Sequence, residues 1–237
     1  MILLQYMKKI HRFLTTDIPT QEIFTISDER ISHQINDVLM LKTGEEIILF
    51  TDGGDDEVVT LESTDKGSVS VKRNRTINVH TNSPRWLVAA VGIPKGSTFE
   101  TIVQKLTEVG VSHIVPILSS RTVKEGVRID RLQAISNEAL EQCGGNKKVV
   151  IHEPIPLSEC LKQFHYTSIV FSPEGEMLSS SKKENSMVMY IGPEGGWDTE
   201  DWKLFQEAGA STASLGQRVL RTETAAIVGA YQLLWGL

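Results

Sequence analysis

The sequence predicts an α/β protein in two parts: a β-rich domain over residues 1–80 and a mainly parallel α/β domain over residues 81–237. Short apolar segments separated by turn-type clusters fill the first part, which is typical of a small barrel or sheet. Longer apolar runs alternate with helical patterns in the second part, which is typical of a parallel sheet covered by helices. The polar stretch "HTNSPR" at 80–85 contains a proline and places the boundary between them.

Composition indicates an ordinary globular protein, with 40% hydrophobic and 23% charged residues in 237. The two cysteines, Cys143 and Cys160, have neither a paired spacing nor a nearby His-x-x-x-His pattern. They predict neither a disulfide framework nor a metal site, so a reducing cytoplasm is the expected location. The apolar start is seven residues long, too short for a signal peptide or a membrane span, and Met7 is the more natural first residue.

The net charge of −6 limits the classes of partner. Acidic residues exceed basic ones on both sides of the expected boundary. Because basic side chains supply most non-specific affinity for nucleic acid, this balance argues against a protein that coats nucleic acid in general. It leaves room for a local basic face.

In the first part, strands are expected at 10–14, 22–26, 45–50, 56–63 and 67–73, with one helix at 32–41. The "DGGDD" cluster at 52–56 fits a solvated hairpin turn better than a binding loop. Basic residues gather at the two ends of this part, at Lys8, Lys9, His11 and Arg12 and at Lys72, Arg73 and Arg75. They fit either solvated strand ends or a basic patch split between the two ends.

The second part begins with a continuous apolar run at 85–93, the pattern of a buried parallel strand. The next segment carries Phe99, Ile102 and Leu106 on one helical face, Gly110 stops that helix, and "HIVPIL" at 113–118 forms a second strand. These elements make one strand–helix–strand unit. Helices at 128–143 and 157–164 and strands at 148–154, 167–173 and 187–193 continue the alternation.

Two glycine-bearing loops follow strands near the carboxyl end, where an open α/β sheet forms its ligand crevice. The first contains Gly192, Gly195 and Gly196. It lacks the G-x-G-x-x-G order of a dinucleotide site and the Gly-Lys-Ser/Thr end of a phosphate loop. Its glycines would let backbone amides approach a ligand closely, while Glu194 is either a hydrogen-bonding group or a solvated carboxylate.

The second loop leads from Gly216 into an apolar helix and places Arg218, Arg221 and Glu223 within six residues. Thr222 is the expected N-cap of that helix, since threonine caps helix starts well. Arginines beside the free amides of a helix start suit a phosphate or a carboxylate. A salt bridge between an arginine and Glu223 that ties the helix start is the alternative.

These residues carry a resemblance. "YIGPEGGW" followed by "LGQRVLRTETAAIVG" resembles the carboxyl-terminal signature of the RsmE family. Those are SPOUT-class enzymes that use S-adenosylmethionine to methylate N3 of a uridine in 16S ribosomal RNA of the small subunit. "IPKGSTFETIVQKLTEVGVSHIVPILSSRTV", "EALEQCGGNKK" and "HQINDVLMLKTGEEIILFTDG" also resemble family segments in the same order, so the similarity spans nearly the whole chain from Lys8.

The resemblance implies an N-terminal PUA-like β-barrel that binds RNA and a C-terminal SPOUT methyltransferase domain whose deep trefoil knot holds S-adenosylmethionine and dimerises. The substrate would be 16S ribosomal RNA or the assembled small subunit, with no membrane and no metal involved. The cofactor-binding residues carried over are Gly192, Glu194, Gly195, Gly196, Leu215, Gly216, Leu220 and Thr224. Arg218, Arg221 and Glu223 are the candidate catalytic residues, and Lys8, Arg12, Lys72, Arg73, Lys95 and Lys105 the candidate RNA contacts.

The chain departs from the family pattern at two places, Met40 and Gly145, where the family commonly has arginine. Both departures remove a candidate RNA contact. They therefore weaken the assignment of the exact RNA target more than that of the methyl donor. Two alternatives stay open: a SPOUT methyltransferase acting on another RNA, and a non-catalytic RNA-binding dimer. A nucleotide-dependent α/β enzyme would need a phosphate loop that the sequence lacks.

Overall fold

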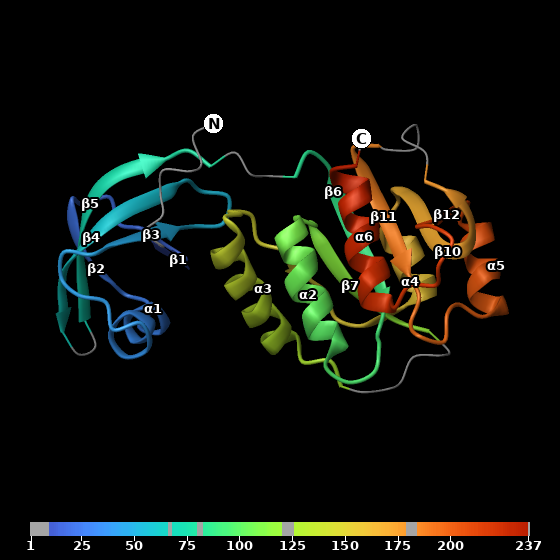
Figure 1. The fold of residues 1–237 in the computed structure, drawn as a ribbon, viewed down its shortest axis with the longest axis horizontal. Coiled ribbons are helices and arrows are strands. Elements are labelled where there is room, and N and C mark those ends of the chain that lie inside the picture. The colour runs from blue at the N-terminus through green and yellow to red at the C-terminus, as the bar shows by residue number, and fades with distance from the viewer. Residues whose placement is uncertain (1–9, 66–67, 80–82, 120–125, 179–183, 237) are drawn as a thin grey trace. The chain divides into compact units, whose positions relative to one another are not determined.

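The computed structural model describes residues 10–65, 68–79, 83–119, 126–178 and 184–236 (Figure 1). These residues form two compact units. Unit 1 is the chain up to residue 82 together with 140–147, and unit 2 is the remainder, 83–139 and 148 onward. The insertion of 140–147 into unit 1 was not expected from the sequence, which suggested a single crossing point near residue 80.

Unit 1 is a five-stranded sheet in the order β1-β3-β4-β5-β2. Its strands are β1 (His11–Leu14), β2 (Ile23–Ile26), β3 (Glu46–Phe50), β4 (Asp56–Asp65) and β5 (Ser68–Ile77). β1 and β3 are parallel, and the other neighbours are antiparallel. The "DGGDD" cluster joins antiparallel β3 and β4, which confirms the predicted hairpin turn.

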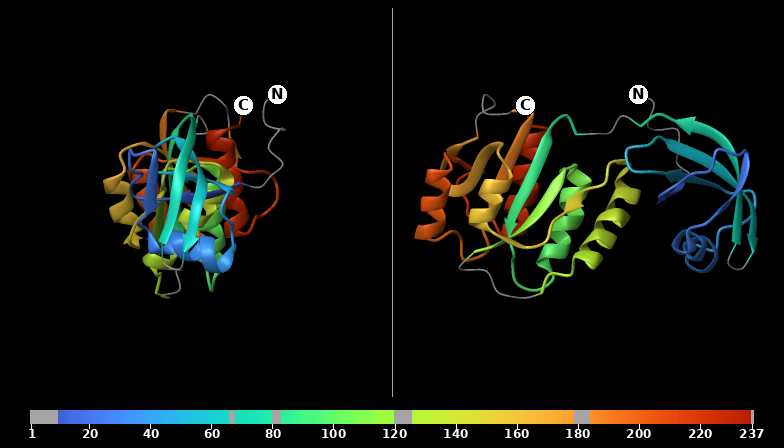
Figure 2. Two further views of the ribbon diagram at one scale, coloured as in Figure 1. Left: turned by 90° about the vertical axis from the view of Figure 1, so that its left-hand side faces the viewer. Right: turned by 180° about the vertical axis from the view of Figure 1, so that it is seen from behind.

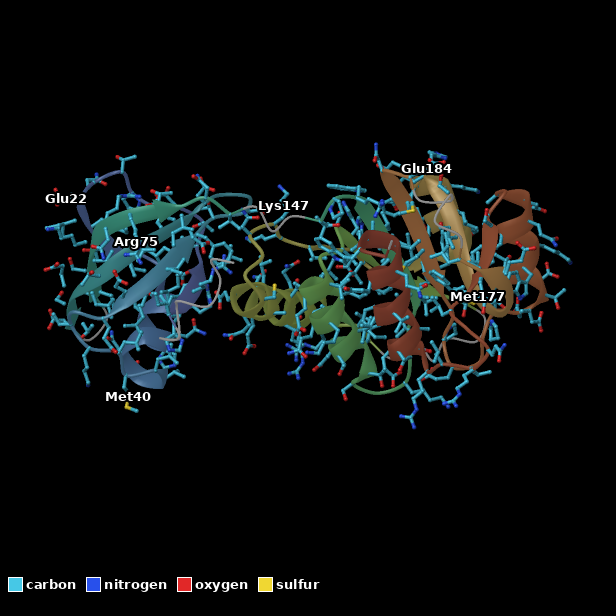
Figure 3. The ribbon with its side chains drawn as sticks, turned by 45° about the horizontal axis from the view of Figure 1, so that its top comes forward. Glu22, Met40, Arg75, Lys147, Met177 and Glu184 are labelled. Carbon is cyan, nitrogen blue, oxygen red and sulfur yellow. The ribbon has the colours of Figure 1, made fainter. Side chains whose placement is uncertain are left out.

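The helical segment of unit 1 starts earlier than predicted. Asp28 caps α1 (Glu29–His33) by accepting hydrogen bonds from the backbone amides of Arg30 and Ile31. A wider π-type turn, η1 (Gln34–Val38), continues it. The segment ends at Met40, whose φ of 50° lies in the left-handed region that costs a non-glycine residue energy. Figure 3 shows the Met40 side chain pointing away from the body of unit 1.

Unit 2 is a parallel α/β sheet in the order β12-β10-β11-β6-β7-β8, with β9 also paired to β7. Its strands are β6 (Trp86–Gly92), β7 (His113–Leu118), β8 (Val150–Ile151), β9 (Ile155–Pro156), β10 (Thr167–Met177), β11 (Ser186–Ile191) and β12 (Ser211–Ser214). Its helices are α2 (Thr98–Val109), α3 (Ile129–Cys143), α4 (Leu157–Gln163), α5 (Thr199–Glu207) and α6 (Thr222–Leu234). The predicted α/β class with a parallel sheet is therefore confirmed.

Both faces of this sheet are covered. Alternate residues of β6 enter two separate cores: Leu87 and Val91 pack with α2 and α6, whereas Val88 and Ala90 pack with α4 and α5. Figures 1 and 2 show these pairs of helices on opposite faces. This explains the uninterrupted apolar run in the sequence, because a strand buried on both faces has no polar side to show.

The strand predicted at 148–154 was too long. Only Val150 and Ile151 form β8, and β9 follows separately at Ile155–Pro156. The backbone amide of His152 still donates to the Ile114 carbonyl, but the chain then leaves the ladder. An apolar run marks burial here without specifying how many residues pair.

Candidate functional site

The carboxyl ends of β10, β11 and β12 form the candidate site, because the loops that follow neighbouring parallel strands meet at one edge of the sheet. Figure 3 marks the two edges of unit 2: Met177 at the carboxyl end of β10 and Glu184 before the start of β11. The predicted cofactor residues follow β11 and β12 and so lie at the carboxyl edge. The structure brings their two loops to the start of the same helix, α6.

A hydrogen bond joins the first glycine loop to that helix. The Thr222 hydroxyl donates to the Gly192 carbonyl oxygen at 3.1 Å. The N-cap prediction for Thr222 was wrong: Arg221 occupies the N-cap position, and Thr222 is the first helical residue. The side chain finds its partner 30 residues away in the sequence and not in the helix's own first turn.

One glycine in each loop adopts a backbone conformation that favours glycine. Gly196 has a φ of +66° and Gly216 a φ of +128°, conformations that residues with a side chain rarely adopt. No heavy atom of the described structure, apart from the chain neighbours, lies within 4 Å of the ideal β-carbon position on either residue. Both positions therefore combine a glycine-specific backbone with open space, as a close backbone approach to a ligand requires.

The second loop is held by a serine. The Ser214 hydroxyl donates to the Gly216 carbonyl at 3.0 Å and lies 3.2 Å from the Gly216 amide, which donates back to it. Leu215 is half-buried against the core beneath α6, and Leu220 is half-buried as well. Thr224 is exposed on the first turn of α6. The predicted residues of this loop thus divide into a buried base and an exposed rim.

The candidate catalytic residues lie on that rim. The Arg221 side chain is 87% exposed, Glu223 is 27% exposed, and their closest charged atoms are 4.0 Å apart. An exposed ion pair at this distance contributes little to stability. The structural alternative, in which a salt bridge ties the helix start, is therefore weakly supported. Arg218 is exposed in the same loop, so two guanidinium groups are available to an anion at the mouth of the site.

Two features of the site were missed by sequence reasoning. The segment Ser-Pro-Glu-Gly at 172–175 lies inside β10, where the pairing with β12 is interrupted by a bulge, and it matches Gly-Pro-Glu-Gly at 192–195 after β11. β10 and β11 pair in parallel with Val170 opposite Tyr190, and continuing that register brings both segments to the same level of the sheet. The repeated Pro-Glu-Gly triplet was the signal that could have found this bulged segment.

The second missed feature is Trp197, which follows the first glycine loop and is 9% exposed. Its indole ring fills the space beside Gly192, where a β-carbon would lie 3.4 Å from the ring. Within the described part of the chain, its buried Nε1 has no hydrogen-bond partner. A buried donor left unpaired is costly, so this N–H suits an acceptor on a bound molecule.

Burial keeps two ionisable groups beneath the first loop protonated. It raises the pKa of the Cys160 thiol to about 12 and also raises the pKa of the Tyr190 hydroxyl. A group with a pKa this high is already protonated at neutral pH and cannot take a proton from a substrate. Neither residue is therefore a candidate general base.

A histidine pair lies at the opposite, amino-terminal edge of the sheet. His113 Nδ1 and His152 Nε2 are 2.7 Å apart, with Trp86 and Phe164 packed against the two rings. Burial and the neighbouring ring lower the pKa of His113 to about 4, and burial lowers the pKa of His152. Both rings are therefore neutral at physiological pH, and their position separates them from the glycine loops.

The candidate RNA contacts differ in their surroundings. Arg12 is committed to unit 1: its side chain is 10% exposed, pairs with Asp56 at 2.7 Å, lies over the Phe50 ring and donates to the carbonyls of Leu140 and Gly145. The expectation that Arg12 lies on an open basic face is therefore wrong. Its partner comes from a strand 44 residues away in the sequence.

Three of the other candidate cations also have carboxylate neighbours. Lys72 lies 3.5 Å from Glu22, and Arg73 pairs with Glu57. On α2, Lys105 pairs with Glu108 at 2.7 Å, in a position three residues away on the helix. Lys95 is exposed in the loop before α2, and Lys8 lies outside the described residues. Of the two alternatives for the basic residues of unit 1, these pairings weaken the basic patch.

Metal and membrane features are absent from the described chain. In those residues, no group of three or more His, Cys, Asp or Glu side chains is arranged to hold a metal ion. None of the helices that the structure describes is long and apolar enough to cross a membrane. Cys143 and Cys160 are both free thiols.

Comparison with known proteins identifies the family. Residues 81–234 match the model of the RNA methyltransferase domain family. The chain is 30% identical over 220 residues to ribosomal RNA small subunit methyltransferase E of Bacillus subtilis, covering 85% of this chain and 86% of that protein. It is 28% identical to the Synechocystis enzyme of the same name, covering 85% of this chain and 69% of the relative.

Solved structures agree. Ribosomal RNA small subunit methyltransferase E from Neisseria gonorrhoeae, bound to S-adenosyl methionine, superposes with a TM-score of 0.86 at 28% identity, covering 95% of this chain and 98% of that one. A methyltransferase from Legionella pneumophila in complex with the same cofactor gives 0.86 at 25% identity, covering 95% and 97%. The chain therefore belongs to the ribosomal RNA small subunit methyltransferase E family of RNA methyltransferases.

Proposed function

We propose that this protein transfers a methyl group from S-adenosylmethionine to N3 of a uridine in 16S ribosomal RNA. The observation that carries the proposal is the joining of two glycine loops at the start of α6 through Thr222 and Gly192, in a chain whose relatives are named small-subunit methyltransferases. Relatives of the same fold were solved with the cofactor bound, which supports the same cofactor here.

The finer architecture belongs to the same proposal. Residues 1–80 would form a PUA-like β-barrel that binds RNA, and residues 81–237 a SPOUT domain with a deep trefoil knot. The late strand β11 lies between β6 and β10, a chain order that accords with such a threaded topology. A homodimer formed through the SPOUT domain would act on 16S ribosomal RNA or on the small subunit in the cytoplasm.

The residues present fit the proposed cofactor. Gly196 and Gly216 leave open space for backbone approach, and the buried Trp197 indole N–H awaits an acceptor. We assign cofactor contacts to Gly192, Gly195, Gly196, Leu215, Gly216, Leu220 and Thr224, with Glu194 exposed in the first of their two loops, and we add the bulged segment of β10 at 172–175 as a third wall. When bound, S-adenosylmethionine would supply a methyl group bonded to a sulfonium, which a nucleophile would take while the carbon–sulfur bond breaks and the thioether leaves.

The chain's own contribution is mainly positioning. Holding two reactants in line contributes about 7–11 kcal/mol to lowering a barrier, whereas a general base gives about 10²–10⁴-fold in rate. We assign Arg221 and Arg218 to orienting the uracil or its phosphate and to stabilising negative charge that develops on the base. Glu223, close to Arg221, orders the arginine or assists removal of the N3 proton.

RNA contacts are proposed at Lys95, which is exposed beside the site, and at Lys8, Lys72, Arg73 and Lys105. A cation that already has a carboxylate partner must exchange it for a phosphate, so Lys72, Arg73 and Lys105 are weaker candidates than Lys95. Arg12 is not retained, because its buried ion pair with Asp56 occupies the guanidinium group.

The decisive experiment compares methyl acceptors. Purified protein and radiolabelled S-adenosylmethionine are incubated with naked 16S ribosomal RNA, assembled small subunits, large-subunit RNA and transfer RNA, and modified nucleosides are identified by mass spectrometry. Formation of 3-methyluridine in 16S RNA or in the small subunit supports the proposal. Methylation of another RNA alone would show that this RNA, and not 16S ribosomal RNA, is the substrate. If titration calorimetry detected no binding of S-adenosylmethionine at millimolar concentration, a non-catalytic RNA-binding dimer would be favoured.

A further inference from the structure

A side chain of the first glycine loop holds a neighbouring loop of the same unit. Glu194 Oε1 accepts a hydrogen bond from the backbone amide of Lys95 at 3.1 Å. Lys95 belongs to the loop between β6 and α2, 99 residues away in the sequence. Both side chains are exposed, so the contact lies at the surface of the carboxyl edge and not in the core.

The base of the Glu194 loop is fixed from two sides. The Thr222 hydroxyl binds the carbonyl of Gly192 on one side. On the other side, Pro193 lies directly against β6, since an ideal β-carbon on Gly92 would come within 2.6 Å of the Pro193 nitrogen. Glu194 is therefore the outward-facing residue of a turn whose neighbours are locked in place.

The loop that is hydrogen-bonded to Glu194 carries a cationic side chain, Lys95, next to the proposed site. β6 neighbours β11 in the sheet, and β12 lies beyond β10 on the other side. The exposed Lys95 after β6 and the exposed Arg218 and Arg221 after β12 therefore flank the glycine loop from opposite sides. Anionic RNA that enters the site would meet positive charge on both flanks.

We propose that Glu194 is a positioning residue that holds the Lys95 loop in register with the first glycine loop, so that Lys95 meets an RNA phosphate at a fixed place relative to the methyl donor. This inference rests on the proposed function. It assigns the Glu194 carboxylate to the RNA side of the site, in addition to its place in the cofactor loop.

The alternative role for the carboxylate is direct contact with the cofactor, whose sulfonium and amino groups are positive. The two roles differ in what a glutamine would do. The amide oxygen of glutamine still accepts the Lys95 N–H, but it lacks the charge that a cationic ligand would need. Glu194→Gln therefore preserves the positioning role and removes the direct one.

The test uses the full chain with the substitutions Glu194→Ala, Glu194→Gln, Lys95→Ala and the double change of both residues to alanine. Glu200→Ala serves as the control, because it removes one exposed carboxylate from α5. The dissociation constant for S-adenosylmethionine is measured by calorimetry, that for in vitro transcribed 16S ribosomal RNA by fluorescence anisotropy, and the methylation rate is split into kcat and KM.

We expect Glu194→Ala to weaken RNA binding about 5- to 10-fold, the scale of one typical hydrogen bond, with cofactor affinity unchanged within about twofold. In Glu194→Gln, the dissociation constants for RNA and for S-adenosylmethionine should both stay within about twofold of the wild-type values. Lys95→Ala should weaken RNA binding as much as Glu194→Ala does, and the double variant should lose no more RNA affinity than either single variant.

Two results would overturn the proposal: weaker cofactor binding in Glu194→Gln with RNA binding intact, or fully multiplicative losses in the double variant. Stronger RNA binding in both Glu194→Ala and Glu200→Ala would show a general charge effect and would also overturn it. Failure of the proposed function is seen separately, because wild-type protein would then methylate no 16S RNA.

Discussion

Replacing Gly92 with alanine tests the close approach between β6 and the first glycine loop. The added β-carbon would lie 2.6 Å from the Pro193 nitrogen and closer still to its ring, whereas carbon and nitrogen atoms normally stay about 3.5 Å apart or more. Gly92 is paired opposite Ile117 of β7, so we expect the loop to move in preference to the strand. The loop at 192–196 must therefore move by roughly 1 Å.

The magnitude follows from two opposing effects. Overpacking of this kind costs about 1–3 kcal/mol, and alanine recovers about 0.4–1 kcal/mol by restricting the unfolded chain. We expect a net loss of about 1–2 kcal/mol in the free energy of unfolding. Because a shift of about 1 Å in positioning groups can cost on the order of 10²-fold in rate, kcat/KM should fall on that scale.

The assays are urea denaturation, calorimetric titration with S-adenosylmethionine and methylation kinetics, under conditions where both proteins are folded. Gly126→Ala is the stability control, because its β-carbon would meet no described heavy atom within 4 Å and its φ is outside the left-handed region. That variant should stay within about 0.5 kcal/mol of wild type. Wild-type stability and cofactor affinity in Gly92→Ala would refute the close approach, and lost stability with intact affinity would separate this loop from the cofactor site.

Three further predictions use the same measurements. Thr222→Ala should lose about 1 kcal/mol and bind cofactor several-fold more weakly, because the hydrogen bond to the first glycine loop is gone, whereas Thr222→Ser should restore both. Arg221→Ala and Glu223→Ala should each lower turnover on the order of 10²-fold while leaving stability within about 0.5 kcal/mol, since their ion pair is exposed; wild-type turnover in both variants at saturating cofactor would contradict their assignment. The pKa of His113 is about 4 in the folded protein, against an ordinary value of 6.5 for the unfolded chain. The contribution of this residue to the free energy of unfolding is therefore fully present above pH 6.5 and is lost as the pH falls from about 6.5 to about 4. The full shift corresponds to about 3 kcal/mol, which solvent screening of the half-exposed ring reduces to on the order of 1–2 kcal/mol. Because pH 5 lies between the two pKa values, denaturation at pH 7.5 and pH 5 should show roughly three-fifths of this loss, and a His113→Phe variant should show a smaller one.

The sequence predicted well where local pattern and burial agree. The apolar run at 85–93 became β6, buried on both faces, because a strand with two covered faces leaves a signal that needs no partner to interpret. The helix over residues 98–109 ended at Gly110 in the left-handed conformation, since a glycine that follows an amphipathic pattern is a sufficient stop. Such features are properties of single segments.

Prediction failed where a side chain's partner is distant in the sequence. Thr222 looked like a helix cap, but its hydroxyl binds a loop carbonyl from another strand end. Arg12 looked like a surface cation, yet Asp56 and two carbonyls from residues 140–147 enclose it. Local pattern specifies the type of residue that a site needs, and only the fold decides which partner that residue finds.

The position of β11 has a consequence for how the protein is made. Residues 186–191 fill the centre of the unit 2 sheet, between β6, which is synthesised much earlier, and β10, which ends at Met177. Until they emerge from the ribosome, the facing edges of β6 and β10 have no strand to pair with, and both carry buried-type apolar side chains. Such long-range pairing slows folding and exposes nascent chains to aggregation and proteolysis. A prematurely terminated chain that ends before residue 186 would therefore lack the central strand and the glycine loop together, and we expect it neither to complete the unit 2 sheet nor to bind the methyl donor.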